Sequence, residues 1–285
     1  MALMDFLNKR NTSDEEMSFI DHLEVLRWHL IRSIIAIVIC AIIVFIYIDE
    51  ITDKIIMAPT KPGFIATRWF CWLGEKIHVK SLCFDGTALP RFQETAMTGQ
   101  FIASFNVAFI AAFIVAFPYI FWEIWRFVRP ALSDKERKQT TGIIFWVSIL
   151  FFLGVLFGYF VLTPFMVGFY FNYKLSPQID VKPTFADYLE NLTYTTAGIG
   201  LLFQMPLLVL LLSQIGILTS GFLKKYRRHA LVVILIAAAI ITPSTDPISL
   251  TIVTIPLYLL YEASIMVAAR VEKKRPPEDR VEEWS

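Results

Sequence analysis

Residues 101–121 are FIASFNVAFIAAFIVAFPYIF, a stretch without a charged side chain. An α-helix needs roughly 20 apolar residues to cross the hydrocarbon core of a bilayer, and this stretch is long enough. Only helices and closed barrels satisfy their backbone hydrogen bonds in lipid. The stretch therefore predicts a membrane-spanning helix.

Similar apolar runs occur on both sides of this helix. The whole chain has 285 residues, 56% of them hydrophobic and 25 of them phenylalanine, a composition typical of membrane proteins. We predict an all-α membrane protein with six transmembrane helices. The predicted spans are 31–48, 101–121, 142–164, 191–212, 230–242 and 248–269.

The fifth predicted span is short, because its apolar run extends only from Ala230 to Ile241. A turn at 243–247, containing two prolines and Asp246, separates it from the sixth. So short a connection predicts that the last two helices are antiparallel neighbours. A short span requires a locally thinner bilayer or tilted neighbours.

The basic residues are unevenly distributed among the short loops. Five Lys and Arg lie in 122–141 and four in 213–229, whereas only two lie in 165–190. Because Lys and Arg accumulate in cytoplasmic loops, both termini are predicted to be cytoplasmic and the large loop 49–100 periplasmic. We expect a multi-pass protein of the cell inner membrane, with a cytoplasmic N-terminal tail at 1–17 and a disordered tail at 276–285.

Two polar side chains lie at predicted membrane depth, and both should face protein or a water-filled cavity. Gln204 precedes Met205 and Pro206, so it either repairs a proline-disturbed helix through an interhelical hydrogen bond or belongs to a functional cavity. Glu262 lies eight residues before Arg270, near the cytoplasmic surface, where structural anchoring is the favoured role.

No nucleotide-binding glycine loop, HExxH, CxxC or GxSxG motif occurs, so we expect neither an enzyme nor a cofactor. The four histidines do not suggest a metal site. Cys40 lies in an apolar run, where a buried free thiol is expected. Cys71 and Cys83 share the loop 49–100, and an oxidising periplasm favours a disulfide between them if the fold brings their Cα atoms within about 7 Å.

Several short segments together resemble the TatC family, the multispanning subunit of the Sec-independent, or twin-arginine, protein translocase. The match extends from Ser18 to about Arg270. Each motif alone is a weak signal, and it is their combination that is specific for the family. The segments are His22-Leu-Glu-Val-Leu-Arg27, Pro118 with Trp125-Arg-Phe-Val-Arg-Pro-Ala-Leu132, Lys135-Glu-Arg137, Phe203-Gln-Met-Pro206, Thr242-Pro243 with Asp246, and Ile255-Pro256 with Tyr261-Glu262.

The resemblance implies a glove-shaped six-helix bundle that binds twin-arginine signal peptides of folded proteins on its cytoplasmic face. It also implies assembly with TatA- and TatB-type single-span subunits, a homo-oligomer within the receptor complex, export driven by the proton-motive force, and no nucleic-acid partner. By the same resemblance, Pro118, Thr242, Asp246 and Glu262 contact partner subunits or stabilise the fold.

Two adjacent guanidinium groups require fixed carboxylates for charge-assisted pairing. Glu136 matches the acid that the family carries in its loop, and Arg27 matches the arginine of the first motif. Val25, however, stands where the family has a glutamate. Glu24 is one residue earlier and Asp21 about one helical turn earlier, so our hypothesis is that Asp21 or Glu24 replaces it.

Gln204 stands where the family has Glu or Gln in a periplasm-facing pocket. Its amide excludes a titratable proton relay at this position.

Two other classes of protein were weighed. A secondary transporter would show internal repeats and broken helices around a midplane site, and no repeat is evident. An intramembrane enzyme would need a nucleophile, a metal set or an acid pair at one depth, which Gln204 and Glu262 do not supply.

Overall fold

The computed structural model describes residues 19–61, 63–78, 92–128, 142–172, 176, 182–242 and 247–274. Within these ranges the chain is helical apart from short connections and one isolated bridge between Gln93 and Thr184. The predicted all-α class is therefore confirmed.

The helices follow one another in the order α2 (Phe19–Ile46), α3 (Ile48–Ile51), a π-helical turn η1 (Thr52–Ile56), a 3₁₀ turn η2 (Ala58–Thr60), α4 (Ile65–Ile77), α5 (Gly99–Val128), α7 (Ile143–Phe157), a π-helical turn η5 (Gly158–Leu162), α8 (Thr163–Asn172), α9 (Phe185–Leu202), α10 (Met205–Ile215), α11 (Ser220–Lys225), α12 (Arg227–Ile241) and α13 (Pro247–Lys274).

By length and composition, five helical stretches in the described ranges could cross a membrane. They coincide with the first, second, third, fourth and sixth predicted spans and are Leu23–Ile46, Gly99–Val128, Ile143–Tyr170, Phe185–Gln214 and Ser249–Lys273. The fifth predicted span corresponds to α12, which has 15 residues. At 1.5 Å per residue it is about 22 Å long, shorter than the roughly 30 Å hydrocarbon core. A sixth span thus stays a prediction.

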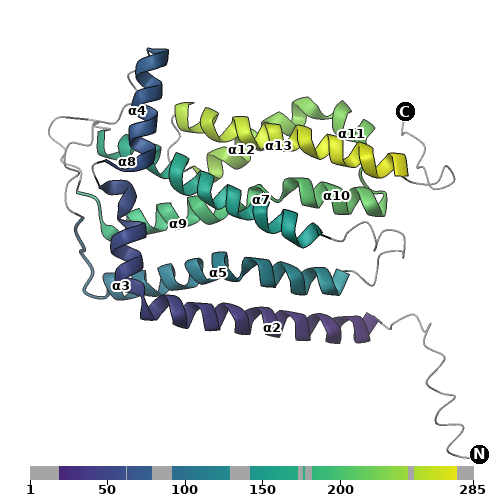
Figure 1. The fold of residues 1–285 in the computed structure, drawn as a ribbon, viewed down its shortest axis with the longest axis horizontal. Coiled ribbons are helices and arrows are strands. Elements are labelled where there is room, and N and C mark those ends of the chain that lie inside the picture. Colours follow the sequence, from purple (N-terminus) through teal and green to yellow (C-terminus); the bar gives the residue numbers. More distant parts are fainter. Residues whose placement is uncertain are drawn as a thin grey trace, which may run out of the picture.

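The long helices run side by side (Figure 1). At one edge α2 packs along α5, which also contacts α7 and α9. At the other edge α13 contacts α10, α11 and α12. The first residue of α2 and the last of α13 lie at the same end of the bundle, whereas α3 and α4 lie at the opposite end (Figure 1).

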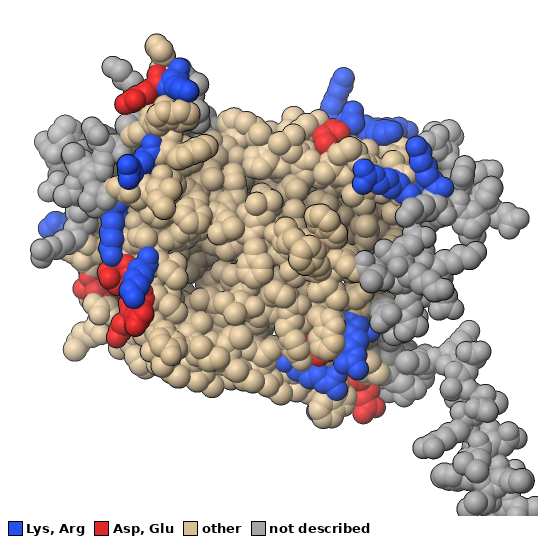
Figure 2. Space-filling view, viewed as in Figure 1, with Lys and Arg blue, Asp and Glu red and all other residues tan. Residues whose placement is uncertain are grey.

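Charged side chains occupy the two ends of the bundle and leave an uncharged belt between them (Figure 2). Blue Lys and Arg side chains are prominent at the end where α11 meets α12 and where α13 finishes. Isolated charges are costly in hydrocarbon, so the belt is the surface that faces lipid.

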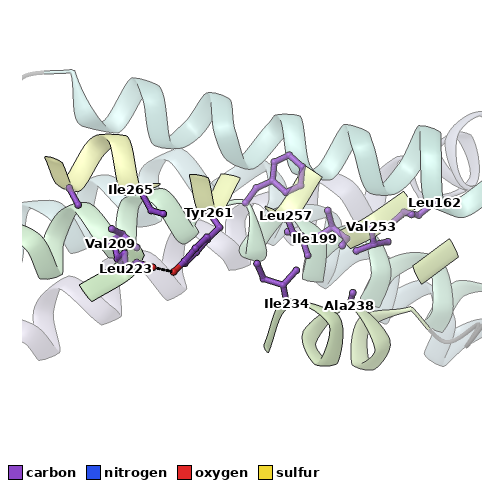
Figure 3. Packing of buried hydrophobic residues seen from close by; sticks show 12 residues of the cluster. Leu162, Ile199, Val209, Leu223, Ile234, Ala238, Val253, Leu257, Tyr261 and Ile265 are labelled. Carbon is purple, nitrogen blue, oxygen red and sulfur yellow. Dashed lines mark hydrogen bonds between the residues drawn. The ribbon is translucent and has the colours of Figure 1, made fainter. Parts of the chain in front are cut away.

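The largest buried cluster joins the carboxyl-terminal half of the bundle (Figure 3). Ile199 of α9, Val253 and Leu257 of α13 and Ala238 of α12 are almost fully buried within it. At one side of the cluster, the Tyr261 hydroxyl donates to the backbone oxygen of Leu223 at 2.7 Å. This bond fixes α11 against α13.

Glycines allow α7 and α9 to approach closely. A Cβ atom added at Gly154 would lie 2.9 Å from the Cα of Gly200 and 2.8 Å from the Phe203 ring. A Cβ at Gly158 would lie 2.9 Å from the Cα of Thr196. Small residues of this kind are common where membrane helices pack backbone to backbone.

Gly154→Ala should therefore destabilise the α7–α9 contact by about 1–3 kcal/mol, since the added methyl group overpacks it. Gly198→Ala is the matched control, because its Cβ would find no atom closer than 3.4 Å. Thermal unfolding of the detergent-purified protein measures both. Equal melting temperatures for the two variants would contradict this packing.

Candidate functional site

A buried carboxylate lies where α2 packs on α5, at the bundle end that holds the first residue of α2. Glu123 of α5 is only 1% exposed, although it belongs to a helix that is otherwise largely apolar. The facing side of α2 contributes two other buried polar residues, His29 and Ser33, one helical turn apart.

Three side chains surround the Glu123 carboxylate. His29 Nδ1 is hydrogen-bonded to Oε2, and the Tyr119 hydroxyl donates to Oε1 at 2.9 Å. Arg32 Nη1 lies 3.9 Å from Oε2, and its side chain is 47% exposed. We call these four residues the Glu123 cluster. A buried charge is tolerated only when it is paired and hydrogen-bonded, and this cluster meets that requirement.

The residues predicted on α2 lie near this cluster. Glu24 and Arg27 are both exposed, and neither forms an ion pair within the described part of the chain. Glu24 precedes His29 by five residues, about 7.5 Å along the helix axis. Val25 is 38% exposed. Asp21 belongs to α2, but its side chain lies outside the described residues, as do Glu136 and Asp246.

The remaining predicted residues of the carboxyl-terminal half are engaged within the fold. Glu262 accepts from Arg227 Nη2 at 2.8 Å and from the Tyr258 hydroxyl at 3.2 Å, joining α13 to the start of α12. The buried Thr242 hydroxyl donates to the Ala238 oxygen at 2.8 Å and so closes the end of α12.

Pro118 lies inside α5, which continues past it.

A second carboxylate on α13 was not anticipated from the sequence. Glu272 accepts from the backbone N–H of Ser220 and, at 2.5 Å, from the Ser220 hydroxyl. Because Ser220 begins α11, this contact and the Arg227–Glu262 pair attach both short helices to α13.

Gln204 lies in a break between α9 and α10. It is 7% exposed, and its Nε2 donates to the Val147 oxygen of α7 at 3.3 Å. Its Oε1 is buried without a hydrogen-bond partner in the described structure. Pro206, in the first turn of α10, is tolerated there because that turn lacks intrahelical acceptors for its N–H groups. Gln204 thus forms the expected interhelical hydrogen bond to α7. Its Oε1 remains available to accept a hydrogen bond from water or a ligand.

Cys71 is disulfide-bonded, whereas Cys40 is a free thiol that is only partly buried, not buried as expected. Cys83 lies outside the described residues, so its pairing with Cys71 stays a prediction. Among the residues that the structure describes, no group of three or more His, Cys, Asp or Glu side chains could hold a metal ion.

Sequence reasoning missed the Glu123 cluster. The second span was predicted to end at residue 121, which placed Glu123 in a loop, but α5 continues to Val128. The available signal was an acid four residues after Tyr119, within reach on one helical face.

The fold and this site define a multi-pass helical membrane protein whose charged groups cluster at the ends of the bundle. The family model for "Sec-independent protein translocase protein (TatC)" matches residues 21–256. The chain belongs to the TatC family.

Two curated relatives match along nearly the whole chain. The Sec-independent protein translocase protein TatC of Blattabacterium sp. subsp. Periplaneta americana is 41% identical over 262 residues, which cover 91% of this chain and 98% of the relative. The Sec-independent protein translocase protein TatC of Halalkalibacterium halodurans is 32% identical over 278 residues, which cover 95% of this chain and 99% of the relative.

Two solved structures share the fold. A crystal structure of the twin-arginine translocase receptor TatC superposes with a TM-score of 0.62 at 27% identity and covers 88% of this chain and 99% of its own. A second crystal structure of the same receptor, in DDM, superposes with a TM-score of 0.67 at 25% identity. It covers 87% of this chain and 99% of its own. The protein is thus a membrane component of Sec-independent protein transport, a transport subunit rather than a catalytic enzyme.

Glu123→Ala should lower the melting temperature by roughly 5–10 °C, because it leaves the buried hydrogen-bonding groups of His29 and Tyr119 without their partner, at a cost of about 1–3 kcal/mol each. Glu123→Gln should cost less, since an amide oxygen can still accept a hydrogen bond. Glu24→Ala removes an exposed carboxylate of the same type and should shift the melting temperature little. If the Glu123→Ala and Glu24→Ala variants had the same melting temperature, the cluster would not stabilise the fold.

Proposed function

We propose that this chain is the receptor and core subunit of a twin-arginine translocase. It binds the twin-arginine signal peptides of folded proteins at the bundle end that carries the Glu123 cluster. It assembles with TatA- and TatB-type single-span subunits, forms a homo-oligomer within the receptor complex, and takes part in export driven by the proton-motive force.

One observation carries the proposal: the Glu123 cluster attaches the start of α2 to the end of α5. Glu24 lies on that part of α2, and the segment with Glu136 directly follows α5 at Val128. Glu24 and the last residue of α5, after which the chain continues to Glu136, therefore lie at one end of the bundle. Two guanidinium groups recognised together need two carboxylates within reach of one another.

Glu24 is one of the two candidate substitutes for the glutamate that the resemblance places at Val25, the other being Asp21. Its carboxylate is exposed, and no other described residue forms an ion pair with it. Glu123, in contrast, is buried and already bonded to His29 and Tyr119, so it positions α2 rather than binding a peptide directly.

The proposed orientation places this end in the cytoplasm and the protein in the cell inner membrane. The basic residues of α11, α12 and the end of α13 lie at the same end of the bundle, which agrees with the distribution of Lys and Arg in cytoplasmic loops. We propose that α12 is the sixth span and that the bilayer thins around it.

The exposed apolar face of α12 is available to single-span helices of partner subunits. Val232, Val233, Ile236 and Ile240 are each more than half exposed. Thr242 and Glu262 are bonded internally, so we assign them structural roles, together with Pro118, and leave Asp246 as the candidate for partner contact.

Glu136→Lys should weaken binding of a twin-arginine peptide at least tenfold, because it replaces attraction with repulsion. An Asp21→Asn/Glu24→Gln double variant should weaken it as well. Glu190→Lys, which reverses an exposed acid at the start of α9, is the matched control. Fluorescence anisotropy with twin-arginine and twin-lysine peptides measures each affinity.

Equal affinity for the two peptides in the unaltered protein would contradict specific receptor function. Unchanged binding in Glu136→Lys would remove the loop-acid assignment alone, and unchanged binding in the double variant would remove the Asp21/Glu24 assignment.

A further inference from the structure

A groove of about 700 Å³ lies between α7, α10 and α13, in the half of the bundle that ends with Arg270. Its floor includes Val147 and Leu207, which are both buried. Its walls are apolar apart from Gln214, and Arg270 is the charged residue in its lining. None of the residues assigned above to peptide binding lines it.

The break at Phe203–Gln204 explains why a groove forms here. Before the break, α9 packs tightly on α7 through Gly200 and Gly154. After the break, α10 packs mainly on α13, while Leu207 of α10 keeps a side-chain contact with the α7 cluster of Val147 and Phe151. The groove lies between these helix pairs, with lining residues at the start of α7 and near the end of α13.

The length of the groove matches one leaflet of a bilayer. Its lining on α7 extends from Ile143 to Leu153, ten residues or about 15 Å. The hydrocarbon core is roughly 30 Å thick, so the groove covers about half of it. An acyl chain of a phospholipid occupies this depth, whereas a transmembrane helix crosses the whole core.

The charge where the groove meets the start of α7 and the end of α13 selects the head group. Arg270 is exposed, and no described carboxylate lies within ion-pair distance of it. Trp146 lines the same end and is 70% exposed, as is typical of tryptophan at a membrane–water interface. A guanidinium group beside an apolar groove between membrane helices suits an anionic lipid head group.

We propose that this groove is a binding site for one anionic phospholipid, with an acyl chain against Leu150, Leu153 and Leu210 and the phosphate paired with Arg270. The lipid fills the space between α7, α10 and α13. The site depends on the membrane embedding of the bundle and is independent of twin-arginine recognition.

The first test is native mass spectrometry of the detergent-purified protein titrated with phosphatidylglycerol. The unaltered protein should retain one lipid, and Arg270→Gln should weaken its binding about tenfold, the loss expected for one charge-assisted contact. Arg228→Gln is the matched control, because Arg228 is equally exposed at the start of α12 but does not line the groove. Equal binding by both variants would overturn the proposal, as would equal binding of phosphatidylethanolamine.

The second test locates the acyl chain through tryptophan fluorescence. Phosphatidylglycerol with brominated acyl chains should quench the protein, and Trp146→Phe should remove the part of the quenching that saturates with one lipid. Trp72→Phe, which alters an exposed tryptophan of α4, should leave that part intact. Saturable quenching unaffected by Trp146→Phe would show that the lipid binds elsewhere. A crosslink from Leu153 to a bound signal peptide in place of lipid would also overturn the proposal.

Discussion

Lipid offers no hydrogen-bond partners, so polar groups buried in the uncharged belt must be paired within the protein. Small hydroxyls meet this constraint locally: Ser33, Thr193 and Ser264 each donate to the carbonyl oxygen four residues earlier in their own helix. Larger polar groups cannot do so and need another helix. Glu123 and Gln204 are two such cases among the described residues.

Pairing Glu123 determines how α2 and α5 fit together. Its bond to His29 joins residues 94 positions apart and leaves one face of α2 in contact with α5. The adjacent turn of α2, with Glu24 and Arg27, is thereby held at the bundle end from which the segment after α5 emerges. Structure and proposed recognition are linked at this point, because the buried carboxylate positions the exposed one.

The helical spans could be predicted from the sequence because apolar length is a strong local signal. The prediction was weaker at helix ends: α5 extends past residue 121 to Val128, and this error hid Glu123. The His29–Glu123 pair gave no local signal, since its partners are far apart in the chain. The groove beside Arg270 was equally hidden, because α7, α10 and α13 line it together. Val25, by contrast, was recognised as a departure from the family motif, and the exposure of Glu24 agrees with the proposed replacement.

The uncharged belt embeds the bundle in the membrane, and we propose that the Glu123 end lies in the cytoplasm. A single cysteine at position 228 or 190, in a background in which Cys40, Cys71 and Cys83 are all replaced by Ser, tests this orientation in intact cells with a membrane-impermeant maleimide. The account predicts that Glu190→Cys is labelled from outside, whereas Arg228→Cys is labelled only after the cells are opened. Labelling of both positions from outside, or of Arg228→Cys alone, would contradict it.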